Sequence, residues 1–377
     1  MESLRKAAGS LLVVGLGSTE LTGLERAWLK LVRPGGVILF KRNIKDPMQT
    51  QALLNEVTSF CAPQAVRCVD IEGGTVNRVR DALAALPSAQ AVGAAMRRLR
   101  KPQLSREHGE LIARATAAFG FNTTLAPVVD LALPEAAEVL GSRPPGRNAE
   151  EVTAYAREFL AGLASHGVTG CGKHFPGLGG ASGDTHFVMP EIERTWKQVW
   201  SEDLVPYREL HRAMPMIMMN HAAYPATPGG VRPASASAFW ITTVLRKRIG
   251  YRGIILSDDL EMGGILKFLP VDQAAIAAVA AGSDLLEICH SPELVLRSYE
   301  ALLSEAEKSA AFRKLLLARA AEVERKRRRL YSGGNSRSLT PKQIEQLRGR
   351  IARFRELIAA SGTDAIAPRT AAPAETS

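Results

Sequence analysis

Gly253-Ile254-Ile255-Leu256-Ser257-Asp258-Asp259 is an almost wholly apolar run that ends in two carboxylates. Consecutive apolar side chains rich in Ile and Leu are typical of a strand buried on both faces, as in a parallel sheet. Polar groups directly after such a strand are typical of an active site, because parallel-strand enzymes place their chemistry at the carboxyl ends of the strands. This run therefore predicts a buried parallel strand with reactive groups at its end.

The same pattern recurs along the chain, with helical patterns between the runs. Eight candidate strands cover residues 10–16, 36–41, 65–70, 122–130, 167–173, 216–221, 253–259 and 284–289. Candidate helices lie in the gaps, for example over residues 47–61, 150–166, 240–249 and 274–281. Such alternation fits a (β/α)8 barrel and also an open, doubly wound sheet.

Polar residues at the strand ends favour the barrel. They are Asp70, Asp130, Lys173, His174, Asn220, His221, Asp258 and Asp259. In a closed barrel these ends meet at one mouth, whereas an open sheet would spread them along an edge. We therefore predict an α/β protein built as a (β/α)8 TIM-type barrel with a C-terminal helical extension.

The chain is longer than a single barrel requires, since it has 377 residues and such a barrel takes roughly 250. We expect the catalytic barrel over residues 1–310, a basic helical extension over 311–360 and a disordered tail over 361–377. Within the extension, Thr340 and Pro341 predict the start of a helix, because Thr is a favourable N-cap and Pro suits the first turn.

The net charge of +10 is concentrated near the C-terminus. Residues 313–355 hold fourteen Lys and Arg against three Glu, so the rest of the chain is close to neutral. The densest run, residues 325–329, is either the solvated face of a long helix or a surface that attracts phosphate or an anionic membrane. We favour the solvated face.

The cysteines and the N-terminus bear on the compartment. The four cysteines show no CxxC or zinc-ligand spacing, so we expect reduced thiols. No apolar run approaches the roughly 20 residues of a membrane span. Arg5 and Lys6 precede an apolar stretch and could open a signal peptide, but no small-residue cleavage site follows. We expect a cytoplasmic protein.

The longest glycine-rich loop runs from Lys173 to His186, after the fifth candidate strand. Its glycines allow the backbone movement that closure over a substrate requires. Asp184 stands two residues before His186, a spacing at which a carboxylate can orient the imidazole and raise its basicity. The two residues are a candidate pair for proton transfer.

Asp258 and Asp259 offer a second chemical group. Because successive residues of a strand face opposite sides, one of the two carboxylates points into the mouth. A carboxylate in that place can act as nucleophile, base or metal ligand. Asp259 can alternatively cap the next helix.

A surface for a hydroxyl-rich ligand is indicated at the same mouth. Asp70 can accept hydrogen bonds from two adjacent sugar hydroxyls, and Arg78 can donate. Arg143, Lys173 and His174 add further donors. No His and Cys cluster suits zinc, and neither a dinucleotide fingerprint nor a phosphate-binding loop is complete. We expect no metal and no cofactor.

Together these segments resemble the family 3 glycoside hydrolases, in particular the single-barrel bacterial β-N-acetylglucosaminidases. The resemblance spans about residues 10–306. It lies in residues 35–43, 70–78, 173–186, 233–235 and 257–262.

The resemblance implies a role for each candidate. Asp258 would be the nucleophile that forms a glycosyl-enzyme intermediate, His186 the general acid/base, and Asp184 its orienting partner. Asp70, Arg78, Arg143, Lys173 and His174 would bind the sugar in the first subsite. The implied activity is retaining exo-cleavage of terminal β-linked N-acetylglucosamine, from peptidoglycan-derived muropeptides or chitooligosaccharides. The implied enzyme is a monomer with no nucleic-acid or integral-membrane partner.

The chain departs from the family pattern at a few positions. Leu178 stands where a second His is usual, Thr185 replaces Ser, and Pro144-Pro145 follow Arg143. None of these changes removes a proposed catalytic group. The alternatives are a β-N-acetylglucosaminide phosphorylase or a broader β-glucosidase on the same fold. A more distant alternative is a non-catalytic barrel whose basic extension binds nucleic acid or a membrane.

Overall fold

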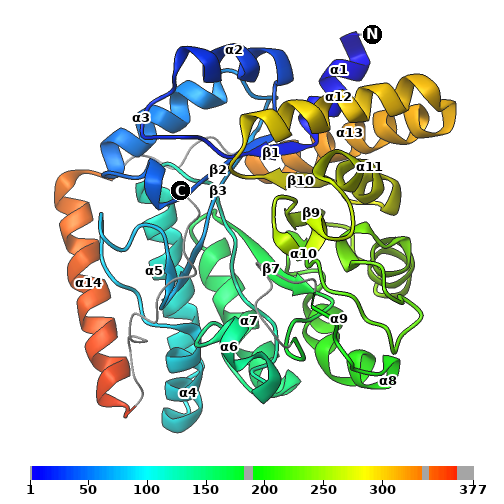
Figure 1. Cartoon of the computed structure of the whole chain (residues 1–377). Helices are drawn as coiled ribbons and strands as arrows, with labels where there is room; N and C mark the ends of the chain where they lie inside the picture. The colour runs from blue at the N-terminus through cyan, green and yellow to red at the C-terminus, as the bar shows by residue number, and fades with distance from the viewer. Residues whose placement is uncertain (1, 182–189, 333–338, 363–377) are drawn as a thin grey trace.

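The computed structural model describes residues 2–181, 190–332 and 339–362, and eight parallel strands form a closed barrel at its centre (Figure 1). In order around the barrel they are β1 (Leu12–Val14), β10 (Leu285–Ile288), β9 (Ile254–Asp259), β8 (Met216–Met219), β7 (Thr169–Phe175), β6 (Thr123–Thr124), β3 (Val66–Val69) and β2 (Gly36–Leu39). β1 closes the barrel because it pairs with both β2 and β10. The predicted (β/α)8 barrel is confirmed.

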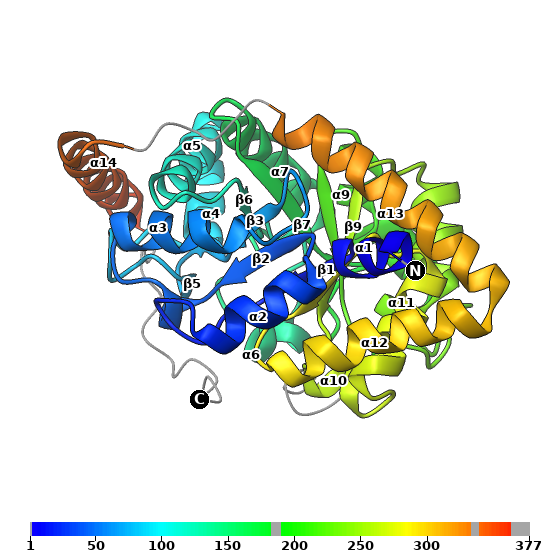
Figure 2. The same cartoon turned by 90° about the horizontal axis from the view of Figure 1, so that it is seen from above.

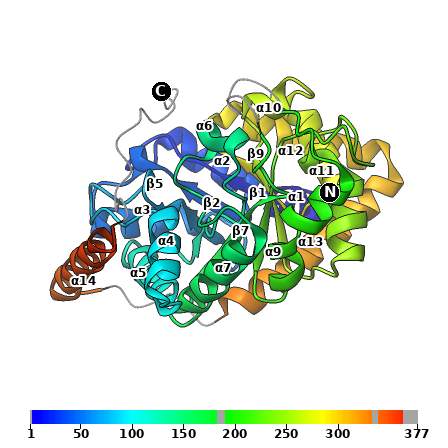
Figure 3. The same cartoon turned by 90° about the horizontal axis from the view of Figure 1, so that it is seen from below.

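Helices surround the strands on all sides (Figures 2 and 3). The main ones that follow a strand are α2 (Gly23–Val32), α3 (Pro47–Thr58), α4 (Ala89–Leu99), α5 (Gln103–Ala118), α7 (Ala149–Ala164), α9 (Val205–Leu210), η5 (Phe239–Arg248), α11 (Val271–Ala281) and α12 (Pro292–Lys308). Every residue of β2, β3, β8 and β10 is buried. This burial explains why the strands are continuous apolar runs.

Shorter elements lie in the connections. They are η1 (Lys41–Asn43), β4 (Ile71–Gly73), β5 (Val76–Asn77), η2 (Pro134–Ala136), α6 (Ala137–Leu140), α8 (Trp196–Gln198), η3 (Val199–Asp203), η4 (Ala234–Ala236) and α10 (Gly263–Leu266). The antiparallel pair β4 and β5 forms a small hairpin directly after β3. Glu72 lies on this hairpin, and Asp70 and Arg78 flank it.

Most strands are shorter than predicted, and the strands predicted over residues 10–16 and 122–130 lose more than half of their length. Ser10 ends helix α1 (Glu2–Ser10), so β1 begins only at Leu12. β6 covers only Thr123–Thr124 of the predicted 122–130. Farther along, Pro127 has no N–H to donate to a ladder. Beyond it, one isolated bridge joins Val128 to Lys173, and the chain therefore still runs beside β7.

Helix α13 (Ala310–Tyr331) carries the basic run and packs against the barrel. Arg327 is 1% exposed and its Nη1 donates to the carbonyl of Gly35 at 2.7 Å, at the start of β2. Lys326 Nζ lies 2.9 Å from Asp284 Oδ2, just before β10. The expected solvated face is therefore wrong for these two cations, which help to close the amino-terminal end of the barrel.

Helix α14 (Pro341–Ala360) begins as predicted, with the Thr340 hydroxyl accepting the N–H of Gln343 at 3.3 Å. It lies on the opposite flank of the barrel from α13 in all three views (Figures 1 to 3). The predicted tail over 361–377 lies outside the described residues except for Ser361 and Gly362. Among the described helices, none has the length and apolar character needed to span a bilayer.

Candidate active site

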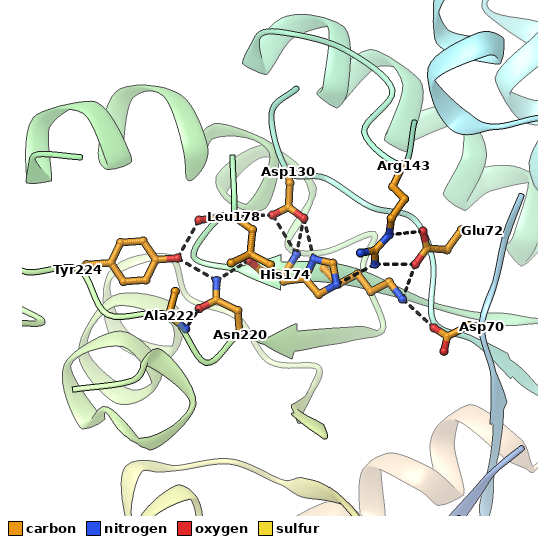
Figure 4. A network of polar contacts seen from close by, with 11 residues as sticks. Asp70, Glu72, Asp130, Arg143, His174, Leu178, Asn220, Ala222 and Tyr224 are labelled. Atoms are coloured by element: carbon orange, nitrogen blue, oxygen red, sulfur yellow. Dashed lines mark hydrogen bonds and ion pairs between the residues drawn. The ribbon is translucent and has the colours of Figure 1, made fainter. Parts of the chain in front are cut away.

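The five residues predicted to bind a sugar lie together at the carboxyl ends of the strands. Asp70 follows β3, Lys173 and His174 belong to the end of β7, and Arg78 and Arg143 reach in from the loops after β5 and α6. Figure 4 shows the polar network that the side chains of Asp70, Arg143 and His174 form with neighbouring groups. The tertiary structure therefore assembles one polar surface from residues as far apart in the sequence as Asp70 and His174.

Glu72, on the hairpin after β3, lies at the centre of this network. Lys173 Nζ is 2.8 Å from Asp70 Oδ1 and 2.6 Å from Glu72 Oε1. Arg143 donates from Nε to Glu72 Oε2 and from Nη2 to Glu72 Oε1, each at 2.9 Å. Arg78 lies farther away, with Nη2 at 3.8 Å from Asp70 Oδ2. Each of the two carboxylates is therefore paired with two cations.

The ion pairs keep these groups charged. Burial alone raises the pKa of the Asp70 and Glu72 carboxyls, but the neighbouring cations outweigh it and hold both pKa values below the usual range. Burial likewise disfavours the charged forms of Lys173 and Arg143, yet the carboxylates raise both pKa values above normal. The mouth therefore presents fixed charges that can bind hydroxyl groups.

His174 joins the network through both ring nitrogens. Arg143 Nη2 lies 3.1 Å from His174 Nε2, and a guanidinium can only donate, so Nε2 accepts. Nδ1 then carries the hydrogen that is donated to Asp130 Oδ2 at 2.7 Å. Asp130, 1% exposed, also accepts the N–H of His174 at 3.1 Å and of Leu178 at 2.8 Å. Asp130 therefore fixes both the imidazole and the start of the glycine-rich loop.

The start of this loop is also bonded to the segment after β8. The Tyr224 hydroxyl donates to the carbonyl of Gly177 at 2.7 Å. The Asn220 side-chain amide donates to the His174 carbonyl at 3.1 Å and to Tyr224 Oη at 2.8 Å. The predicted acid/base pair, Asp184 and His186, lies outside the described residues.

Asp258 and Asp259 at the end of β9 have different surroundings. Asp259 Oδ1 accepts the N–H of Glu261 at 3.1 Å, and burial, followed by the charge of Glu261, raises the pKa of Asp259 to about 8. The raised pKa favours the protonated form of Asp259, which does not suit a nucleophile. The expected alternative of a helix N-cap is wrong, because α10 begins only at Gly263.

Asp258 is half-buried, and its Oδ1 accepts the N–H of Asp259 at 2.9 Å. Its charge reaches the interior of the barrel: burial raises the pKa of Glu287, and Asp258 and Asp70 raise it further. Glu287 also lies 3.9 Å from Cys68 across the barrel. Asp258 and Asp70 therefore act electrostatically on the same buried carboxyl beneath the mouth.

His221 supports the strand end that carries the two aspartates. Its Nε2 lies 2.9 Å from the Asp259 carbonyl and its Nδ1 2.7 Å from Ser235 Oγ. A carbonyl only accepts, so Nε2 carries the hydrogen and the serine hydroxyl donates to Nδ1. Burial lowers the pKa of His221, which agrees with a neutral ring used for positioning.

Sequence reasoning missed three of the groups in this site. Glu72 stands two residues after Asp70, and that spacing could have indicated a shared side of an extended chain. Asp130 was recognised only as a polar strand end, and Tyr224 carried no local signal. Their roles depend on neighbours that are far away in the sequence.

Within residues 2–181, 190–332 and 339–362, no group of three or more His, Cys, Asp or Glu side chains is arranged to hold a metal ion. The site is instead a set of paired charges and hydrogen-bond donors. Such groups can recognise hydroxyl and amide substituents and can supply a carboxylate for covalent or general-base chemistry.

A closed parallel barrel with a polar mouth at the carboxyl ends of its strands defines a TIM-barrel enzyme. Residues 3–325 match the model of the glycosyl hydrolase family 3 N terminal domain. The chain belongs to this family. The predicted family and the predicted glycoside hydrolase class are confirmed.

Similar proteins agree with this assignment. The chain is 38% identical over 284 residues to a beta-hexosaminidase of Chromobacterium violaceum, covering 74% of this chain and 79% of that protein. The solved β-N-acetylglucosaminidase of Paenibacillus sp. has a TM-score of 0.82 at 28% identity, over 94% of this chain and 68% of the other. NagZ of Neisseria gonorrhoeae, solved with N-trifluoroacetyl-D-glucosamine, has a TM-score of 0.76 at 28% identity, over 92% of this chain and 98% of the other.

Proposed function

We propose that this family 3 β-N-acetylhexosaminidase releases terminal β-linked N-acetylglucosamine with retention of anomeric configuration, using Asp258 as nucleophile. The activity class is supported by the beta-hexosaminidase and β-N-acetylglucosaminidase relatives. The observation that carries the proposal is the position of Asp258, which lies at the end of β9 on the same mouth as the ion pairs around Glu72.

The proposed reaction has two displacements. Asp258 attacks the anomeric carbon, the glycosidic bond breaks, and the leaving oxygen takes a proton from His186, which Asp184 orients. Water then attacks the glycosyl ester, His186 takes the proton of the water, and the Asp258 carboxylate leaves. Because each displacement inverts the anomeric carbon, the product keeps the β configuration. A protonated Asp259 adds no negative charge beside the nucleophile.

The first subsite consists of Asp70, Arg78, Arg143, Lys173 and His174 in this proposal. Their ion pairs hold the donors and acceptors in a fixed geometry before the sugar arrives, so little ordering remains to be done on binding. Hydroxyl groups of the sugar can donate to the Asp70 carboxylate and accept from the cations.

The physiological substrate and compartment extend the proposal. We assign peptidoglycan-derived muropeptides as substrate and a monomer in the cytoplasm as the working form. The NagZ complex with N-trifluoroacetyl-D-glucosamine supports an amino-sugar subsite in this fold. All four cysteines are buried and unpaired, which fits a reducing compartment.

The test compares wild type, Asp258→Asn and Glu209→Gln on paired aryl β-glycosides, the N-acetylglucosaminide and the glucoside, with the product anomer followed by NMR. Glu209 is the control, because it is exposed on α9. We expect the β anomer first, a loss of roughly 10³-fold or more in Asp258→Asn, and an unchanged control. Initial α product, or wild-type turnover by Asp258→Asn, would overturn the mechanism. Sugar 1-phosphate as the main product in phosphate buffer would establish a phosphorylase instead.

A further inference from the structure

The hairpin after β3 carries Asp70, Glu72 and Arg78, and a long segment folds behind it. Gly74 N donates to the Leu86 carbonyl at 3.0 Å, and the Asn77 side-chain amide donates to the Ala84 carbonyl at 3.1 Å. Residues 78–88 therefore form the backing of the hairpin, and whatever holds this segment also holds the site residues.

Helix α14 holds this segment from outside the barrel. Arg348 donates from Nε to the Leu83 carbonyl at 3.2 Å and from Nη2 to the Ala82 carbonyl at 3.1 Å. The helix packs against α5 and α4, and its buried side chains recur with helical spacing: Leu347, Ile351, Phe354 and Ile358. These residues follow position 325, where the family match ends.

A second path leads from α14 to the hairpin through His108 on α5. The rings of Phe354 and His108 are stacked, with centroids 5.9 Å apart and planes at 25°. His108 is fully buried and its Nδ1 lies 2.8 Å from the Tyr155 hydroxyl. On its other side, His108 Nε2 is 3.1 Å from the point where a Cβ of Gly73 would lie.

At Gly73 the hairpin packs closely against the segment behind it. The φ of Gly73 is +90°, a conformation that favours glycine, and a Cβ there would lie 2.1 Å from the Pro87 carbonyl oxygen. Burial raises the pKa of Tyr155, and the charge of Glu72 raises it further, so the Tyr155 and His108 pair lies within electrostatic reach of Glu72. Burial lowers the pKa of His108 to about 3, so the ring is neutral and serves packing.

We infer that α14 is a positioning element for the sugar-binding hairpin, acting through the Phe354–His108 stack and the Arg348 contacts with Ala82 and Leu83. The helix sets the place of Glu72 and Asp70, and hence the affinity of the first subsite for the sugar. The inference rests on the proposed function, since that proposal assigns the hairpin residues to sugar binding.

The test compares Phe354→Ala with Phe354→Tyr, which keeps the ring, and with Phe312→Ala. Phe312 is a buried phenylalanine on α13, on the opposite flank, so its loss removes similar packing without touching the hairpin. For Phe354→Ala we expect KM for an aryl β-N-acetylglucosaminide to rise by roughly tenfold with a smaller change in kcat. Phe354→Tyr and Phe312→Ala keep the wild-type KM.

Amide hydrogen exchange of residues 71–86 supplies a readout that needs no activity. We expect faster exchange in Phe354→Ala than in Phe312→Ala. Unchanged exchange would overturn the inference that α14 positions the hairpin. Faster exchange with an unchanged KM would overturn the role of α14 in sugar binding. If wild type cleaves no N-acetylglucosaminide, the proposed function fails, while the exchange result still decides whether α14 holds the hairpin.

Discussion

Arg143 binds Glu72 through two parallel hydrogen bonds, from Nε to Oε2 and from Nη2 to Oε1, each 2.9 Å long. The two residues are 71 positions apart, and their pairing joins the loop after α6 to the hairpin after β3. Bidentate pairs of this kind are strong and directional. The pair therefore orients the guanidinium so that Nη2 also reaches His174.

Replacement of Glu72 by Gln tests how much this buried pair stabilises the fold. Lys173 and Arg143 would keep their charges without a carboxylate between them, and breaking a buried pair costs about 3–5 kcal/mol. We expect the free energy of unfolding, measured by urea titration, to fall by about 3 kcal/mol. Glu209→Gln is the control, because it breaks only the exposed pair with Arg157 and should cost less than about 1 kcal/mol. Equal effects of the two changes would contradict the prediction.

The pH dependence of stability follows from Asp70 and Glu72. Their pKa values are lower in the folded state than in the unfolded chain. The stability that they contribute is therefore fully present above the unfolded pKa of about 4 and is lost as the pH falls toward the folded values. We expect wild type to lose stability on acidification more steeply than Asp70→Asn, as measured by urea unfolding across the acidic range. Parallel curves for the two proteins would refute this assignment.

Asp259 has a pKa shift of the opposite sign, to about 8 from 3.8. Its contribution to stability is present below about pH 4 and is lost as the pH rises through about 8, because the folded state holds a proton that the unfolded chain releases. We expect Asp259→Asn to flatten the stability profile over this range.

The same variant separates the two aspartates by activity. Asp259→Asn keeps an uncharged side chain whose oxygen can still accept the N–H of Glu261, so we expect kcat within about tenfold of wild type at neutral pH. Asp258→Asn serves as the inactive reference. Equal inactivity of both variants would show that Asp259 acts directly in the reaction.

Replacement of Arg327 tests whether its contacts stabilise the amino-terminal end of the barrel. Replacement by Ala removes the hydrogen bond to the Gly35 carbonyl and the buried stem of the side chain, so we expect a loss of about 2–4 kcal/mol in unfolding free energy. Arg329→Ala is the matched control on the exposed side of α13, with an expected change within about 0.5 kcal/mol. At temperatures far below unfolding, kcat should stay at the wild-type value in both. A similar loss in both variants would mean that burial of Arg327 contributes nothing specific.

The barrel could be predicted because burial on both faces leaves a local mark. A strand such as β9 must be apolar at consecutive positions, and its polar end must lie at the mouth, so a window of seven residues contains the information. The limits of β6 were mispredicted because the apolar pattern continues past Thr124, where the regular ladder ends, although Val128 still bridges to Lys173.

The pairing of residues across the barrel could be recognised only in the folded chain. Lys173 meets Asp70 from 103 residues away, and Arg327 meets Gly35 from 292 residues away. In the sequence Arg327 is one of five adjacent cations, and nothing local separates it from its exposed neighbours. Helical periodicity turns it inward only once α13 has docked on the strands. Residue type and local pattern were enough for the strands, the mouth and the candidate chemistry, whereas the pairing of charges depended on how distant segments close around one barrel.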